Sequence, residues 1–158
     1  MGVSRLRERI LSEHEHLRRL LSEVNQQAFQ VSIGGARDGV DALRALGLQL
    51  LMHFREHLAL EDRLLAPALR RVDGTGRERA ERLDADHREQ RELLDYLLDN
   101  VRDQSRPGAV LAAEWRSLVE LLLDDMAREE RTILDPEGAM ELTPAASPSP
   151  GSTRSIGH

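Results

Sequence analysis

The chain has 158 residues, a net charge of −6 and no cysteine. Its length is typical of one domain, and its negative charge argues against binding to a nucleic-acid backbone. The lack of cysteine excludes disulfides, thiolate zinc sites and iron–sulfur clusters. The charged N-terminus has no apolar signal core, and no apolar run is long enough to cross a bilayer. We therefore expect a cytoplasmic protein that binds neither nucleic acid nor membrane.

Apolar residues at helical spacing predict two long helices in the first half of the chain. The first extends over about 4–29 and ends at the sequence IGGARDG, and the second extends over about 38–70. Pro67 should weaken the last turn of the second helix, because proline lacks a backbone N–H. The apolar stripe of the second helix comprises Leu43, Leu46, Leu50, Phe54, Leu64 and Ala68.

Two more helices are predicted in the second half. Thr75 and Glu78 match a capping box at the start of the third helix, and the fourth follows the sequence DQSRPG and ends near Pro136. Residues 1–136 are predicted to form one all-α, up-down-up-down four-helix bundle. Residues 137–158 lack apolar periodicity and are predicted to form a disordered tail.

The second half of the chain repeats features of the first. HLALEDRLLAP, from His57, and DMAREERTILDP, from Asp125, both contain an acid pair, an arginine, apolar residues and a proline. HEHLRRLL, from His14, and HREQRELL, from His87, both have two leucines six and seven residues after the histidine. The pattern indicates a duplicated helical hairpin.

Polar side chains occur on the apolar stripe of every predicted helix when residues are placed at about 100° intervals. His16, by contrast, points away from the stripe. The inward-facing residues lie at similar heights in an antiparallel bundle, so we expect them to meet in one layer. They are His14, His57, Glu61, His87, Asp125 and Glu129.

Such a layer suits a metal site. Three buried carboxylates without partners would be strongly destabilising, and bound dications would offset that cost. Histidine and carboxylate ligands together are typical of iron, manganese or zinc. The alternative is a bundle without metal, in which each histidine is hydrogen-bonded, each acid pairs with an arginine, and the protein is an interaction module.

These residues resemble the hemerythrin-like (HHE cation-binding) family, whose motif is a His, then HxxxE, then a His, then a second HxxxE. The corresponding residues are His14, His57 with Glu61, His87, and Asp125 with Glu129. The resemblance covers about residues 8–136. It implies a non-haem di-iron site, commonly bridged by the glutamates and capped by histidines.

The chain departs from the family motif at its last histidine, which is Asp125. Some family members also have a second histidine one turn after the third-helix histidine, where this chain has Arg91. Asp125 is therefore expected either to bind metal or to form a salt bridge with Arg91. Arg18 is the repeat equivalent of Arg91 in the half of the chain that keeps its His57, so the alternative to the salt bridge is that an arginine at this position extends to solvent.

The resemblance implies a role in oxygen, peroxide or iron handling, with O2 or a small reactive oxygen or nitrogen species as the partner. Iron is the expected metal, as two ions, with zinc and manganese as alternatives. Whether the protein is an enzyme stays open, because a di-iron oxidase or a peroxide-decomposing enzyme would use the same ligands. The metal-free interaction module is the remaining alternative.

Overall fold

The structure is a computed structural model that describes residues 3–34, 37–72 and 74–134. The elements are α1 (Val3–Gly34), α2 (Arg37–Arg70), α3 (Gly76–Arg102) and α4 (Gly108–Thr132). No strand is present in these ranges, so the predicted all-α class is confirmed. The predicted tail, 137–158, lies outside the described residues.

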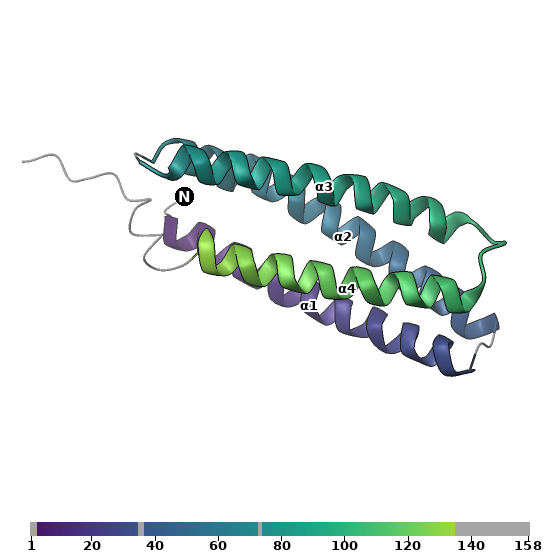
Figure 1. Cartoon of the computed structure of the whole chain (residues 1–158). Helices are drawn as coiled ribbons and strands as arrows, with labels where there is room; N and C mark the ends of the chain where they lie inside the picture. Colours follow the sequence, from purple (N-terminus) through teal and green to yellow (C-terminus); the bar gives the residue numbers. More distant parts are fainter. Residues whose placement is uncertain (1–2, 35–36, 73, 135–158) are drawn as a thin grey trace, which may run out of the picture.

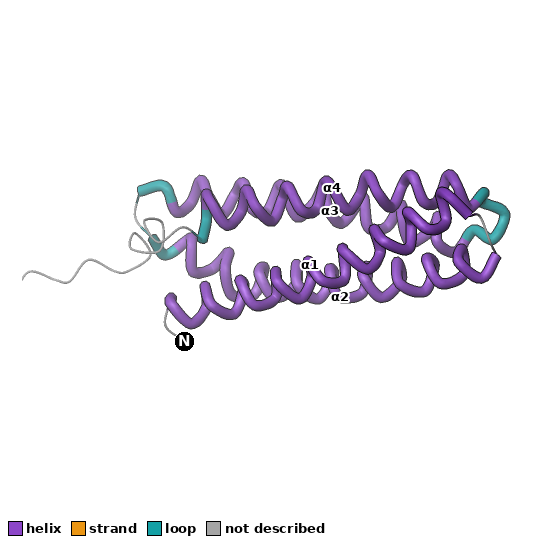
Figure 2. The backbone as a smooth tube through the Cα atoms, turned by 90° about the horizontal axis from the view of Figure 1, so that it is seen from below, coloured by secondary structure: helices purple, strands orange, loops and turns teal. Residues whose placement is uncertain are grey.

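The four helices form an up-down-up-down bundle. Figure 1 shows the α1–α2 and α3–α4 connections at one end, and the α2–α3 connection at the end where α1 begins and α4 finishes. The helices run side by side along the length of the bundle (Figure 2). The closest packing is between α1 and α4, α1 and α2, and α2 and α3. Short connections between long amphipathic helices favour this antiparallel arrangement.

Two predicted helix boundaries differ from the structure. Helix α1 continues past Phe29 to Gly34. Val31 is buried in the core, and its burial stabilises the additional turn. Helix α3 begins at Gly76, and the Thr75 side chain makes no capping hydrogen bond. Thr75 has helical backbone angles (φ −79°, ψ −3°) rather than the extended ones a capping residue needs, so the predicted capping box is wrong.

The apolar stripe of α2 also differs from the prediction in its second half. Leu64 and Ala68 are only partly buried, whereas Leu65 and Leu69 are core residues. Leu65 follows Glu61 by four residues, so it continues the line of side chains that face the bundle axis.

The apolar core is divided into two clusters. One contains Leu17, Leu58, Leu94 and Met126 among its members, and the other contains Ile10, Leu65, Leu83 and Ile133. On each helix a polar residue separates the two clusters: His14 on α1, Glu61 on α2, His87 on α3 and Glu129 on α4. A polar layer therefore crosses the bundle between two apolar regions.

Two contacts fix the α1–α2 end of the bundle. Gly47 on α2 lies against the buried Trp115 of α4, and a Cβ at Gly47 would be 2.4 Å from a carbon of the indole ring. The buried Arg44 donates hydrogen bonds from Nη1 to the carbonyl oxygens of Val101, at 2.7 Å, and Asp103, at 3.0 Å. Arg44 thus satisfies carbonyls that a helix end leaves free.

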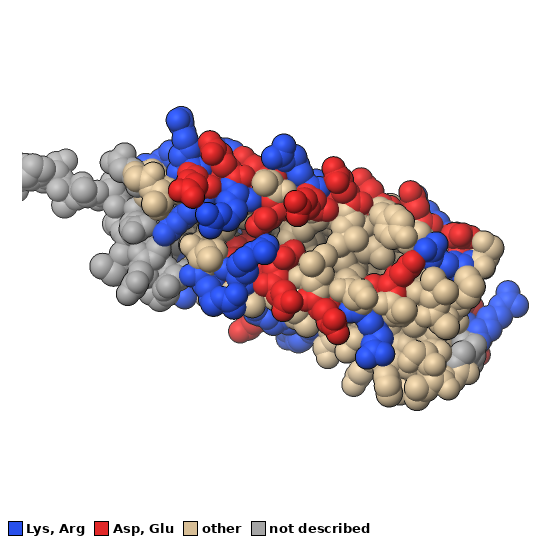
Figure 3. Space-filling model, in the orientation of Figure 1, with Lys and Arg blue, Asp and Glu red and all other residues tan. Residues whose placement is uncertain are grey.

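The surface drawn in Figure 3 has interleaved acidic and basic side chains over the half nearest the beginning of α1, and is mostly uncharged over the other half. None of the described helices is both long enough and apolar enough to cross a membrane.

Candidate metal centre

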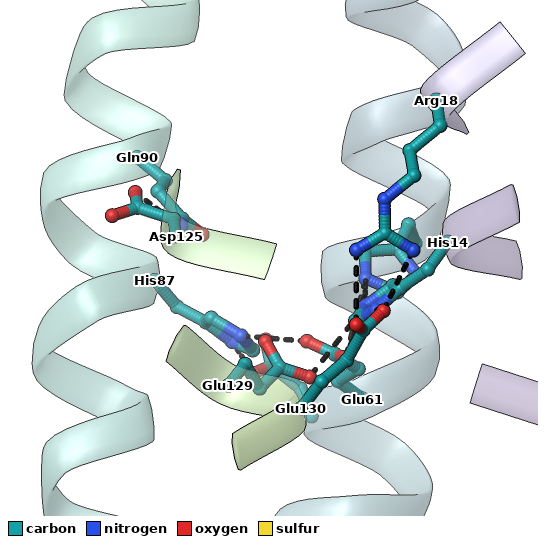
Figure 4. A network of polar contacts seen from close by, with 10 residues as sticks. His14, Arg18, Glu61, His87, Gln90, Asp125, Glu129 and Glu130 are labelled. Carbon is teal, nitrogen blue, oxygen red and sulfur yellow. Dashed lines mark hydrogen bonds and ion pairs between the residues drawn. The ribbon is translucent and has the colours of Figure 1, made fainter. Parts of the chain in front are cut away.

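The polar layer brings together five of the six predicted site residues, one or two from each helix. His14, His57, Glu61 and His87 are buried, and Glu129 has a side chain that is 14% exposed. His57 and Glu61 are four residues apart on α2, so they face the same side of the helix. Figure 4 shows the side chains converging from the separate helices.

His14, His57 and Glu61 form the tightest group. The Nε2 atoms of His14 and His57 are 3.2 Å apart, and Oε1 of Glu61 lies 3.2 Å from Nε2 of His57 and 3.7 Å from Nε2 of His14. Two ligands about 2.1 Å from one ion, at angles between 90° and tetrahedral, are about 3.0–3.4 Å apart. One potential ligand atom from each residue lies within 4.8 Å of the others, so the group can hold a cation with small adjustments.

Glu61 also reaches a second histidine. Its Oε2 atom lies 2.9 Å from Nε2 of His87 on α3, while its Oε1 atom faces His14 and His57. Within the layer, the carboxylate therefore directs one oxygen towards the histidines of α1 and α2 and the other towards the histidine of α3, as a bridge between two ions would require. On α4, Oε1 of Glu129 lies 3.6 Å from Nε2 of His14.

Buried polar atoms without partners support a cation at this position. Oε1 of Glu61, Oε1 of Glu129 and Nδ1 of His57 are buried and lack a hydrogen-bond partner among the described residues. Unsatisfied buried oxygens cost free energy and are rare in folded proteins. A dication would satisfy the two carboxylate oxygens at once, so the residues fit a metal.

The two central carboxyl groups have opposite pKa shifts. Burial by itself raises the pKa of Glu61, but the neighbouring groups, above all the imidazoles of His14, His57 and His87, hold it well below its ordinary value. Burial and then the charge of Glu61 raise the pKa of Glu129 well above its ordinary value. Of the two carboxyl groups, Glu129 therefore binds a proton more readily than Glu61.

His14 and His87 each contact a carboxylate through Nδ1, on the side away from the layer. Nδ1 of His14 lies 2.9 Å from Oε1 of Glu130, and Nδ1 of His87 lies 2.6 Å from Oδ1 of Asp62. For His87, burial lowers the pKa, but hydrogen bonds with Glu61 and Asp62 outweigh it and raise the pKa overall.

Arginines complete these contacts, and one of them overturns a prediction. Arg18 pairs with Glu130 through both oxygens, at 2.8 and 2.9 Å. Arg91 pairs with Asp62, so the predicted salt bridge between Arg91 and Asp125 is wrong.

Sequence reasoning missed Asp62 and Glu130 as site residues. The signal was present, because each is the second acid of the pair shared by the two hairpins. The first acid of each pair faces the layer, and the second, about 100° further around the helix, faces the neighbouring helix. The histidine to which each second acid bonds lies on that neighbouring helix.

Asp125 lies apart from the close group, beside Gln90 of α3 (Figure 4). Its Oδ2 atom accepts a hydrogen bond of 3.0 Å from Gln90, and its Oδ1 atom accepts one of 3.0 Å from Arg128. Arg128 also lies 3.5 Å from Asp86 of α3. Both oxygens of Asp125 thus have partners within the chain, and the predicted role as a ligand stays a prediction.

His16 is exposed, as its phase on α1 predicted. Its ring contacts that of the half-buried His53 of α2, with centroids 5.1 Å apart. The pair lies on the α1–α2 surface and outside the group of buried ligand-type residues.

Comparison with known proteins gives one match. The family model described as the hemerythrin HHE cation-binding domain matches residues 5–135, a range that includes every residue of the polar layer. No curated protein and no solved structure matched the chain. The chain belongs to the hemerythrin HHE cation-binding domain family.

Proposed function

We propose that the protein binds two non-haem iron ions in the polar layer and acts in oxygen, peroxide or iron handling. The observation that carries the proposal is the position of the Glu61 carboxylate, with Oε1 towards His14 and His57 and Oε2 towards His87. A single buried carboxylate between two sets of imidazoles is the arrangement expected of a bridging ligand.

In this proposal His14, His57 and Glu61 hold the first ion, and His87 and Glu61 hold the second. Glu129 would contribute its partnerless Oε1 atom, and because its pKa is raised, metal binding should compete with proton binding at this group. Iron held by these residues would supply redox chemistry towards O2 or a small reactive oxygen or nitrogen species. The two apolar clusters on either side keep bulk water from the layer.

The ligand set accommodates zinc and manganese as well as iron. The family model describes a cation-binding domain without naming the metal, and we propose iron because the resemblance to hemerythrin-like proteins implies it. Metal analysis of the protein purified from iron-replete cells tests this assignment. We expect about two irons per chain, and removal of the iron by a chelator should lower the melting temperature, because an ion bound only to the folded state stabilises it. Equal melting temperatures with and without iron would contradict the proposal.

A second experiment separates the possible roles. Iron-loaded protein that decomposes hydrogen peroxide over many turnovers would be an enzyme, whereas iron-loaded protein that only binds O2 or releases iron would be a carrier. The metal-free interaction module predicts no bound iron and no change in melting temperature when iron is added. The His16→Ala variant is the matched control, because it removes an exposed histidine from α1 and leaves the layer intact.

A further inference from the structure

Two histidines of the polar layer, His14 and His87, each contact their own carboxylate through Nδ1, on the side away from the layer; we call these the outer carboxylates. Nδ1 of His14 lies 2.9 Å from Oε1 of Glu130, and Arg18 holds the Glu130 carboxylate through two contacts of 2.8 and 2.9 Å. His14 and Arg18 are one turn apart on α1, and Glu130 comes from α4. The carboxylate is therefore clamped between an imidazole and a guanidinium, as Figure 4 shows.

The same arrangement occurs a second time at the other side of the layer. Nδ1 of His87 lies 2.6 Å from Oδ1 of Asp62, and Arg91 pairs with the other oxygen of Asp62. His87 and Arg91 are one turn apart on α3, and Asp62 comes from α2.

The two arrangements are related by the duplication of the hairpin. The first helix of each hairpin carries the sequence His-x-x-x-Arg, and the second carries the acid pair. Each histidine takes its outer carboxylate from the second helix of the other hairpin: His14 from α4 and His87 from α2. One accidental surface ion pair would be unremarkable, but the same three groups built twice at matching positions point to a shared role.

We propose that Glu130 with Arg18, and Asp62 with Arg91, are positioning residues that orient His14 and His87 for metal binding. This inference rests on the proposed function, and it assigns roles to four residues outside the metal-facing set. A carboxylate that accepts a hydrogen bond from Nδ1–H keeps the proton on Nδ1 and leaves Nε2, which faces the layer, available to bind a metal. The arginine holds the carboxylate in place and balances its charge.

His57 provides an internal contrast. Its Nδ1 atom is buried and has no hydrogen-bond partner among the described residues, so His57 lacks an outer carboxylate like those at Nδ1 of His14 and His87. The orientation of His57 depends instead on packing, which includes an edge contact with Phe54 at a centroid distance of 5.9 Å. The carboxylate–arginine pairs thus contact only the histidine on the first helix of each hairpin, which is His14 on α1 and His87 on α3.

The test removes each outer carboxylate and measures metal affinity and imidazole tautomer separately. In Glu130→Ala and Asp62→Ala, affinity for Fe(II), measured anaerobically against a competing chelator, should fall about 10- to 100-fold, as is typical when such an outer partner is lost. Glu130→Gln keeps an acceptor oxygen and should recover part of the loss. Asp95→Ala is the control, because it removes the acid of an exposed pair with Arg55 that touches no histidine.

The tautomer is read from 15N chemical shifts of the imidazoles in metal-free protein. In the wild type both His14 and His87 should carry a proton on Nδ1, and Glu130→Ala should remove this preference at His14 alone. Because Glu61 also faces Nε2 of His87, Asp62→Ala should leave the His87 ring protonated on Nε2 instead of Nδ1. Unchanged Fe(II) affinity together with an unchanged tautomer in both alanine variants would overturn the inference.

Failure of the proposed function gives a different result. A wild-type chain that binds no Fe(II) refutes the metal site, while the tautomers of the metal-free chain still decide whether the carboxylates orient the histidines. If an alanine variant does not fold, Arg18→Met serves in its place, since it leaves the Glu130 carboxylate in position. Arg18→Met should lower Fe(II) affinity, but by less than the 10- to 100-fold expected for Glu130→Ala. Unchanged affinity in Arg18→Met would show that Arg18 does not help to position His14.

Discussion

The Oε2 atom of Glu61 lies 2.9 Å from Nε2 of His87, although the two residues come from different helices and different halves of the chain. The other oxygen of Glu61 faces His14 and His57. This one carboxylate therefore joins the two hairpins at the level where the apolar core is interrupted.

The first prediction concerns Glu61 and Glu129. Replacing either with alanine should abolish binding of a pair of ions, because each removes a carboxylate from the centre of the layer. Iron per chain, measured after loading and desalting, checks this. His16→Ala should retain the wild-type iron content. Loss of iron in His16→Ala but not in His14→Ala would show that the phase of α1 is wrong.

The second prediction concerns Asp125, whose two oxygens already accept hydrogen bonds from Gln90 and Arg128. Asp125→Ala should leave the iron content unchanged and lower the free energy of unfolding by about 1 kcal/mol, a typical value for such partly exposed hydrogen bonds. Iron content and chemical denaturation measured on the same sample test both parts. A drop from two irons to one would instead make Asp125 a ligand.

The third prediction uses the close approach of Gly47 to Trp115. Gly47→Ala places a Cβ 2.4 Å from the indole ring, and we expect a net destabilisation of about 1–2 kcal/mol after the helix-propensity gain of alanine. The midpoint of urea denaturation measures the effect.

Gly39→Ala is the matched control for this substitution. Gly39 lies on the same helix, and a Cβ there would meet its nearest atoms at 3.5 and 3.6 Å, which is ordinary contact. This variant should be as stable as the wild type or more stable by up to about 1 kcal/mol. Equal destabilisation by the two substitutions would show that the indole contact is not the cause.

The fourth prediction concerns the buried Arg44. Arg44→Met keeps much of the side-chain volume but removes the hydrogen bonds to the carbonyls of Val101 and Asp103. We expect a loss of about 1–3 kcal/mol, because the buried carbonyl of Val101 then loses this partner, whereas the carbonyl of Asp103 still accepts a hydrogen bond from the N–H of Arg106. Thermal denaturation compares it with Arg55→Met, which removes an exposed ion pair with Asp95 and should cost less than about 1 kcal/mol.

The sequence by itself determined the helices and the residues that point inwards. Both follow from a period of 3.6 residues, which is a local property: His14, Glu61, His87 and Glu129 each interrupt a run of apolar residues on one face of a helix. The motif of His14, His57 with Glu61, His87, and Asp125 with Glu129 also indicated the family, and the match of the family model to residues 5–135 confirms it.

The tertiary structure alone decided which residues pair across helices. Asp62 and Glu130 differ from Glu61 and Glu129 by only one position, and the rotation of each helix sends one acid into the layer and the next to a histidine of a neighbouring helix. Arg91 bonds to Asp62 rather than to Asp125 for the same reason: Gln90, one position earlier on α3, faces α4 and bonds to Asp125, whereas Arg91 faces α2. Such pairings depend on the relative rotation, height and separation of whole helices, which the packing of the complete core sets and no single stretch of sequence contains.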